Sequence, residues 1–193
     1  MAAKPITVPE KLLKLADEIA EVGSANLTRL TVLKKWFEGP LGPNRMRAFG
    51  AWMGRQAIAN GLKAADDEVV PLLKEARSVL RGCDRFRPEL SAAEHEKMRA
   101  VHDHLRDFQN TYRRIQWGAV RQIENWQVYL VERGLALLMR HSYPSDAYRL
   151  AASYCENYDP RYGNGLNGPS RDRILDTARF LRRMEGAESE PAS

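Results

Sequence analysis

The chain has 193 residues, of which 44% are apolar and 28% are charged, so it is long enough to bury one core of ordinary size. These proportions exclude an intrinsically disordered chain, and the isolated cysteines, Cys83 and Cys155, predict neither a disulfide nor a metal site. The formal net charge of +5 keeps nucleic acids and other polyanions among the partners to consider.

Helix signals follow one another along the whole chain. Proline at first-turn positions, capping residues and terminal glycines alternate with apolar side chains at three- and four-residue spacing. Asn26 can cap a helix, and Ser91 with Glu94 forms a capping box. The predicted helices span about 9–22, 27–38, 45–60, 68–81, 91–116, 119–140, 145–158 and 169–185.

We predict an all-α fold, an irregular multi-helix bundle of seven or eight helices with essentially no sheet, because no stretch alternates with period two. The helix over 119–140 has the widest apolar arc and should lie at the centre. The predicted core face of 91–116 consists of Met98, Val101, Leu105, Phe108, Tyr112 and Ile115. One domain is expected over 1–186, followed by a disordered acidic tail over 187–193.

No segment is typical of export or membrane insertion. The first ten residues lack the apolar run of a signal peptide. The most apolar segment, 128–139, is short and contains Glu132 and Arg133. We therefore expect a cytoplasmic protein with no membrane partner.

Positive charge is concentrated in residues 26–63, where seven basic side chains face Glu38 alone. Arginine, which outnumbers lysine 22 to 8 in the chain, binds phosphate in a bidentate manner, although the codon bias of a GC-rich genome also explains this ratio. Trp36, Phe49 and Trp52 interleave with the charges, a combination that suits flexible nucleic acid. The candidate binding residues of this segment are Arg29, Lys34, Lys35, Arg45, Arg47 and Arg55.

A glycine- and asparagine-rich loop precedes the last predicted helix. Its glycines have the spacing of the dinucleotide fingerprint, but the expected preceding strand is missing, which excludes that site. The free amides of the helix start, with Arg171 and Arg173 in its first turns, could instead hold an anion. The alternative is a rigid turn between helices. The candidate loop residues are Gly163, Asn164, Gly165, Asn167, Gly168 and Ser170.

A basic line runs along the helix over 91–116. Its members recur at intervals of three, four and seven residues, which places them on one flank of the helix. Such a line could follow a phosphate backbone, with histidines making the binding pH-sensitive. The alternative is a solvated helix with weak intrahelical ion pairs. The members are His95, Arg99, His102, Arg106 and Arg113.

Signals for catalysis are few. The spacing of Arg99 and His104 resembles that of the HEPN-type helical ribonucleases, and this resemblance implies metal-independent RNA cleavage by these two residues. It covers two residues only, and Ala100 stands where that family usually has a polar residue. No Glu-x-x-His pair predicts a di-iron site.

We therefore expect a non-enzymatic, basic helical binding module without cofactor or metal, whose partner is RNA, DNA or another polyanion. The first alternative is a helical protein–protein adaptor or a subunit of a larger complex. Tryptophan side chains would anchor such an interface. Four are available, Trp36, Trp52, Trp117 and Trp126. A metal-independent ribonuclease is the second alternative.

Overall fold

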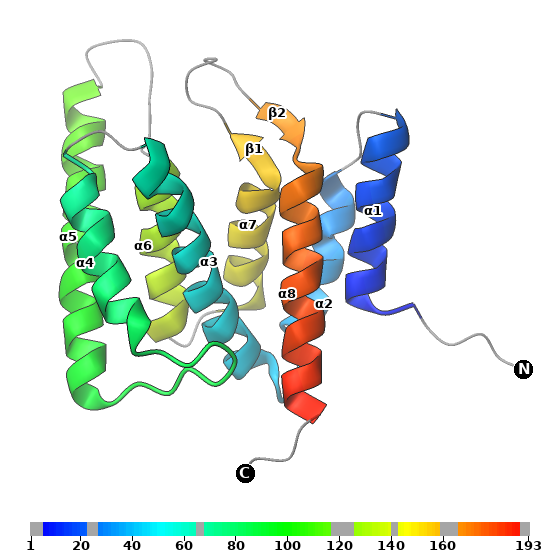
Figure 1. Ribbon diagram of the computed structural model, residues 1–193, viewed down its shortest axis with the longest axis horizontal. Coiled ribbons are helices and arrows are strands. Elements are labelled where there is room, and N and C mark those ends of the chain that lie inside the picture. The colour runs from blue at the N-terminus through cyan, green and yellow to red at the C-terminus, as the bar shows by residue number, and fades with distance from the viewer. Residues whose placement is uncertain are drawn as a thin grey trace, which may run out of the picture.

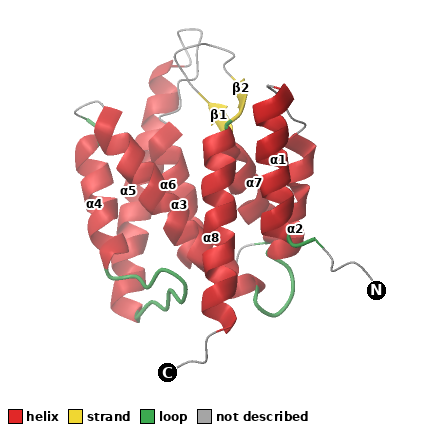
Figure 2. Ribbon diagram, turned by 45° about the vertical axis from the view of Figure 1, so that its right-hand side comes forward, coloured by secondary structure: helices red, strands yellow, loops and turns green. Residues whose placement is uncertain are grey.

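Helices dominate the parts of the chain that the computed structural model describes, which are residues 6–22, 27–64, 68–116, 126–139, 143–158 and 166–189. The prediction of an all-α multi-helix bundle is thereby confirmed (Figures 1 and 2). The elements are α1 (Val8–Val22), a 3-10 helix η1 (Leu27–Thr31), α2 (Val32–Trp36), α3 (Gly42–Ala64), α4 (Val70–Arg81), α5 (Ala92–Gln116), α6 (Trp126–Met139), α7 (Pro144–Cys155), β1 (Glu156–Tyr158), β2 (Leu166–Pro169) and α8 (Arg171–Ser189).

The contact between α3 and α6 forms the centre of the bundle. Side chains of α6 are buried at Val128, Leu130, Val131, Leu135, Leu137 and Leu138, which confirms the central place predicted for this helix. The two helices meet at glycines: a Cβ atom on Gly50 would lie 2.5 Å from the carbonyl oxygen of Gly134. In Figure 1, α4 and α5 lie on one side of this pair, and α7, α8, α2 and α1 lie on the other.

A cluster of aromatic side chains packs α2, α3 and α8 against one another. The ring of Phe49 on α3 packs edge-on against Phe37 and Phe180, and the ring of Trp36 also packs against Phe180. Trp52 and Phe180 stack with their ring centres 4.8 Å apart, which joins α3 to α8. Because such rings bury large apolar areas, this cluster fixes α8 against α3 and α2.

The described residues contain one short two-stranded antiparallel ribbon, which agrees with the expectation of essentially no sheet. β1 pairs with β2 between α7 and α8, with Glu156 opposite Pro169 and Tyr158 opposite Leu166. The helix predicted to reach residue 158 therefore ends at Cys155. The ribbon escaped prediction because three- and four-residue strands are too short to display a period.

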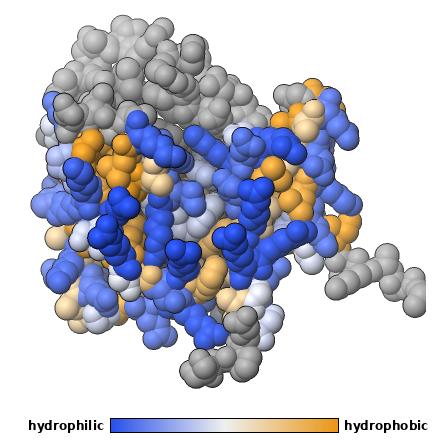
Figure 3. Space-filling view, viewed as in Figure 1, coloured by the Kyte–Doolittle hydropathy of each residue, from blue (hydrophilic) through white to orange (hydrophobic). Residues whose placement is uncertain are grey.

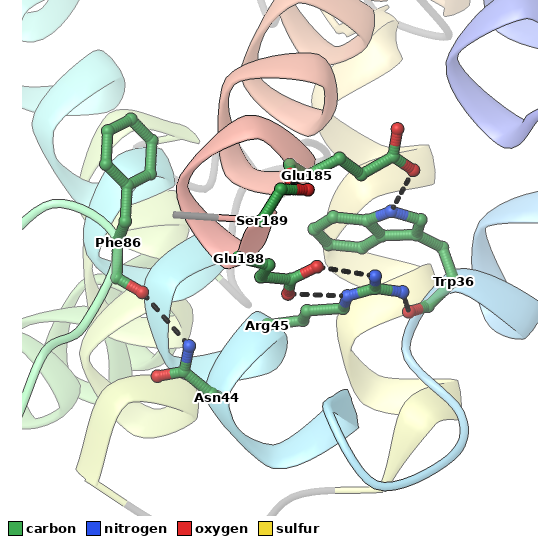
Figure 4. Close-up of polar contacts among 7 residues, drawn as sticks. All are labelled: Trp36, Asn44, Arg45, Phe86, Glu185, Glu188 and Ser189. Carbon is green, nitrogen blue, oxygen red and sulfur yellow. Dashed lines mark hydrogen bonds and ion pairs between the residues drawn. The ribbon is translucent and has the colours of Figure 1, made fainter. Parts of the chain in front are cut away.

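The C-terminal helix is longer than predicted, and the expected tail is wrong over residues 187–189. α8 continues through Gly186 to Ser189 because tertiary contacts hold its last turn. The Glu188 carboxylate binds Arg45 of α3, and the Ser189 hydroxyl donates to the Glu185 carbonyl oxygen (Figure 4). Residues 190–193 lie outside the described residues.

The start of the second predicted helix also differs from the sequence expectation, and the start of the sixth lies outside the described residues. The second predicted helix begins as the 3-10 turn η1 and becomes α-helical only from Val32. α6 begins at Trp126, and the predicted start over 119–125 lies outside the described residues. Within the described ranges, no helix combines the length and the apolar character that a membrane crossing requires.

Candidate anion-binding site

Arg45, one of the predicted binding residues, makes its contacts within the fold. Its Nε and Nη2 atoms donate to the two carboxylate oxygens of Glu188 at 2.8 and 2.6 Å (Figure 4). Its Nη1 atom donates to the Trp36 carbonyl oxygen at 3.0 Å, and the guanidinium lies 4.7 Å from the centre of the Trp36 ring. The hydrogen bonds to Glu188 raise the pKa of Arg45, so its charge is compensated inside the bundle.

Two further predicted arginines bind the carboxyl ends of helices. The Nη2 atom of Arg55 donates to the carbonyl oxygens of Leu80 at 2.9 Å and Cys83 at 2.6 Å, at the end of α4. The Nη1 atom of Arg173 donates to the Tyr154 carbonyl oxygen at 3.1 Å, at the end of α7. The last carbonyl groups of a helix lack intrahelical donors and carry partial negative charge, which a guanidinium satisfies.

The remaining residues of the predicted basic segment do not share one surface with these arginines. Arg29 pairs with Glu18 of α1, whereas Lys34 and Lys35 are exposed on α2. Arg47 is half-buried, and its Nε atom has no hydrogen-bond partner among the described residues. Lys34, Lys35 and Arg47 do not line the two surface hollows that contain Arg55.

The loop residues divide between the ribbon and the start of α8. Gly163, Asn164 and Gly165 lie outside the described residues, while Asn167 and Gly168 belong to β2. The backbone amide of Ser170 donates to the Cys155 carbonyl oxygen at 2.8 Å, and its hydroxyl accepts from the Arg173 amide at 3.4 Å. Ser170 thus caps α8, and Arg171 beside it is exposed.

The basic side chains considered on α5 do not form one exposed line, because two of its histidines face α6. His95 contacts the Met139 carbonyl oxygen at 3.1 Å through Nε2. His102, only 3% exposed, places Nε2 2.9 Å from the Glu132 carboxylate. Arg99 and Arg106 pair with Glu96 and Asp103 of their own helix, as the alternative of a solvated helix expects. The side chain of Arg113 lies outside the described residues.

Arg99 and His104 have different partners. Arg99 pairs with Glu96 at 3.5 Å, whereas the Nδ1 atom of His104 lies 3.4 Å from the Glu75 carboxylate on α4. The two side chains therefore do not meet in a ribonuclease-like pair.

A groove on the outer face of α3 brings arginines together in space. It consists of two adjoining hollows of about 480 and 450 Å³, which share Arg55 and Ala59. α3 forms the floor, α4 forms one wall, and α8 with the segment after α4 forms the other. In Figure 3, strongly hydrophilic side chains line this face with apolar surface between them. We call it the arginine groove; its lining is Trp52, Arg55, Gln56, Ile58, Ala59, Leu62, Arg77, Leu80, Arg81, Arg85, Phe86, Asp176, Arg179, Phe180 and Arg183.

The charge of the arginine groove is strongly unbalanced. Six arginines line it against one carboxylate, Asp176, which pairs with Arg179 at 3.1 Å. Four arginines of the groove remain besides Arg55 and Arg179. Within the described part of the chain, their side chains form no hydrogen bond or ion pair with another side chain or carbonyl group. These are Arg77, Arg81, Arg85 and Arg183.

Arg55 lies where the two hollows join, and it is held there before any ligand arrives. Its two bonds to carbonyl oxygens occupy Nη2, and the described residues supply no partner for Nε or Nη1. Burial lowers the pKa of Arg55, and the positive charge of Arg85 lowers it further, against the opposing influence of Cys83 and Asp84. Burial of the Arg55 guanidinium therefore disfavours its charged form.

Aromatic rings form the floor beside the arginines. Phe180 stacks on Trp52 at 4.8 Å and 19° and on Phe86 at 6.3 Å and 27°. Phe86 is fixed by its backbone: its carbonyl oxygen accepts from Asn44 at 3.0 Å, and its amide donates to Asp84 at 2.8 Å. Hydrogen bonds from the backbone amides of Arg87 and Phe86 lower the pKa of Asp84 and so favour its charged carboxylate form.

Sequence reasoning found Arg55 and Trp52 but missed the other arginines of the groove. A signal was present: Arg77 with Arg81, and Arg179 with Arg183, are four residues apart and thus lie on one helical face each. Charge summed over long stretches of the chain concealed them, because acidic residues elsewhere in the same stretches offset their charge.

No protein family, curated protein or solved structure matches the chain. Among the described residues, no group of histidine, cysteine and carboxylate side chains could hold a metal ion.

Proposed function

We propose that the arginine groove binds a phosphate-bearing polyanion and that the chain is a non-enzymatic nucleic-acid-binding module. The observation that carries the proposal is the half-buried guanidinium of Arg55, which two neutral carbonyl oxygens hold in place. Among the described residues that line the groove, Asp176 is the one carboxylate. A partly buried charge that is held by neutral carbonyl oxygens is costly, and a bound anion would reduce that cost.

The placement of the other arginines favours a ligand with repeated charges over a single small anion. Arg77 and Arg81 follow one wall and Arg179 and Arg183 follow the other, each pair spaced by about 6 Å along its helix. Arginine forks bind phosphate oxygens in pairs, so a chain of phosphates running along α3 could contact several of them. Such contacts supply the sequence-independent part of nucleic-acid affinity.

The proposal is tested by fluorescence anisotropy with a labelled single-stranded oligonucleotide at low salt. Arg179 and Arg183 are exposed, so the double reversal Arg179→Glu with Arg183→Glu changes the groove without removing a structural contact to another helix. We expect this variant to weaken binding by at least about tenfold, roughly the effect of 1.4 kcal/mol lost from two phosphate contacts.

The matched control is Lys34→Glu with Lys35→Glu, which reverses the same number of exposed charges on α2, outside the groove. It should weaken binding by no more than about threefold through the change in overall field. Equal weakening by both variants would show that only net charge matters. Absence of binding by the unaltered protein would end the proposal, and far-ultraviolet circular dichroism verifies that each variant folds.

A further inference from the structure

We infer that the occupant of the arginine groove is a single strand and that one of its bases stacks on Phe86. This inference rests on the proposed function, because it names the class of nucleic acid that the same site accepts. The carrying observation is the juxtaposition of a partly buried, backbone-anchored aromatic ring with four arginines of one hollow.

Phe86 ends a run of three rings. Phe180 lies in the middle, only 5% exposed, with Trp52 on one side and Phe86 on the other. Trp52 is covered further by Tyr154 and Phe49, whereas Phe180 is the one ring of the described residues that packs on Phe86. Phe86 is thus the end of the run, and it lines the hollow.

The segment that carries Phe86 is rigid where a stacking platform needs to be rigid. Asn44 of α3 holds its carbonyl oxygen, and the Asp84 carboxylate accepts hydrogen bonds from the amides of Phe86 and Arg87 at 2.8 and 2.6 Å. A preorganised ring loses little conformational freedom when a ligand binds.

The neighbouring charges suit a nucleotide chain. Arg85 adjoins Phe86 in sequence, and Arg179 and Arg183 line the same hollow from α8. A base on Phe86 would therefore have guanidinium groups beside it for the phosphates on either side. Base faces within a duplex are already stacked, so only an unpaired strand can offer one to Phe86. Every base has such a face, and we expect little sequence preference.

The test compares three probes of equal length on the full chain: a single-stranded oligonucleotide, an abasic strand with the same phosphates, and a duplex. Stacking contributes about 1–3 kcal/mol per base, so the unaltered protein should prefer the base-bearing strand to the abasic strand by at least about fivefold. Phe86→Leu should abolish most of this preference while its affinity for the abasic strand stays within about twofold. Tyr143→Leu, which removes an exposed ring elsewhere, should keep the preference.

The outcomes separate the two proposals. Equal affinity of the unaltered protein for base-bearing and abasic strands would overturn stacking and leave phosphate binding in place, and so would tighter binding of the duplex. An unchanged preference in Phe86→Leu would overturn the role of this ring. Binding of none of the three probes would remove the proposed function itself. A competition experiment compares polyglutamate with inorganic polyphosphate as displacers of the bound strand. If polyglutamate displaces the strand equally well, the groove is assigned to an acidic protein segment and the inference is overturned. Phe86→Tyr, which keeps the ring, should behave as the unaltered protein does.

Discussion

Two groups of arginine side chains in this fold are distinguished by their surroundings. Arg45 and Arg173 end in contacts with buried carbonyl groups and aromatic rings, where they hold α2, α7 and α8 in place. Arg85 and Arg183 line the groove and have no such contact among the described residues. Arg55 belongs to both groups, since it caps α4 with one nitrogen and faces the groove with the others.

Tyr154 gives a residue-scale prediction that depends only on its burial. Burial raises the pKa of its phenol from 10.0 to about 12, and Asp176 contributes in the same direction against Arg173. The protonated phenol is the form that the fold favours. Its contribution to stability is therefore complete below pH 10 and is lost as the pH rises through about 12.

We expect tyrosinate absorbance to show Tyr154 ionising near pH 12, in step with alkaline unfolding. In Tyr154→Phe, the free energy of unfolding should fall less between pH 10 and 12 than in the unaltered protein. Tyr143→Phe, at a side chain that is 76% exposed, serves as the control and should leave this dependence unchanged. Ionisation of Tyr154 near the ordinary value of 10.0 would contradict its assignment as a buried phenol.

At the scale of elements, the approach of α3 to α6 depends on glycine at specific positions. A Cβ atom on Gly134 would lie 2.7 Å from the Gly50 carbonyl oxygen and 3.1 Å from the Gly54 amide nitrogen. These neighbours are backbone atoms, so the helices would have to separate. That movement would also open the contacts of the buried side chains on both helices.

Gly134→Ala should therefore lower the free energy of unfolding by about 1–3 kcal/mol, the usual range for overpacking a core. Gly186→Ala is the matched control, because it lies within α8 and nothing lies within 4 Å of its added Cβ atom. There the higher helix propensity of alanine should raise stability by up to about 1 kcal/mol. Urea unfolding of both variants measures the two effects. Destabilisation of the same size at both sites would mean that the α3–α6 contact is looser than described.

At the scale of the whole molecule, local pattern predicted the helices but not the site. Apolar periodicity and caps such as Ser91 with Glu94 act within one helix, so they located α5 correctly; Ser91 and Glu94 form the expected reciprocal hydrogen bonds. The groove depends on which helices become neighbours of α3, and no local pattern specifies that. Arg81 and Arg179 are far apart in sequence, yet they line opposite walls beside Arg55. The dense basic segment, by contrast, is divided among several faces.

The salt dependence of binding tests the groove most directly, because it counts phosphate contacts. For a single strand, the logarithm of affinity falls with the logarithm of salt concentration by about 0.7 for each neutralised phosphate. Reversing Arg179 and Arg183 together should reduce that slope by about 1.4 if each contacts one phosphate. Reversing Lys34 and Lys35 should leave the slope close to that of the unaltered protein. Equal slopes for the unaltered protein and the groove variant would contradict binding in the arginine groove.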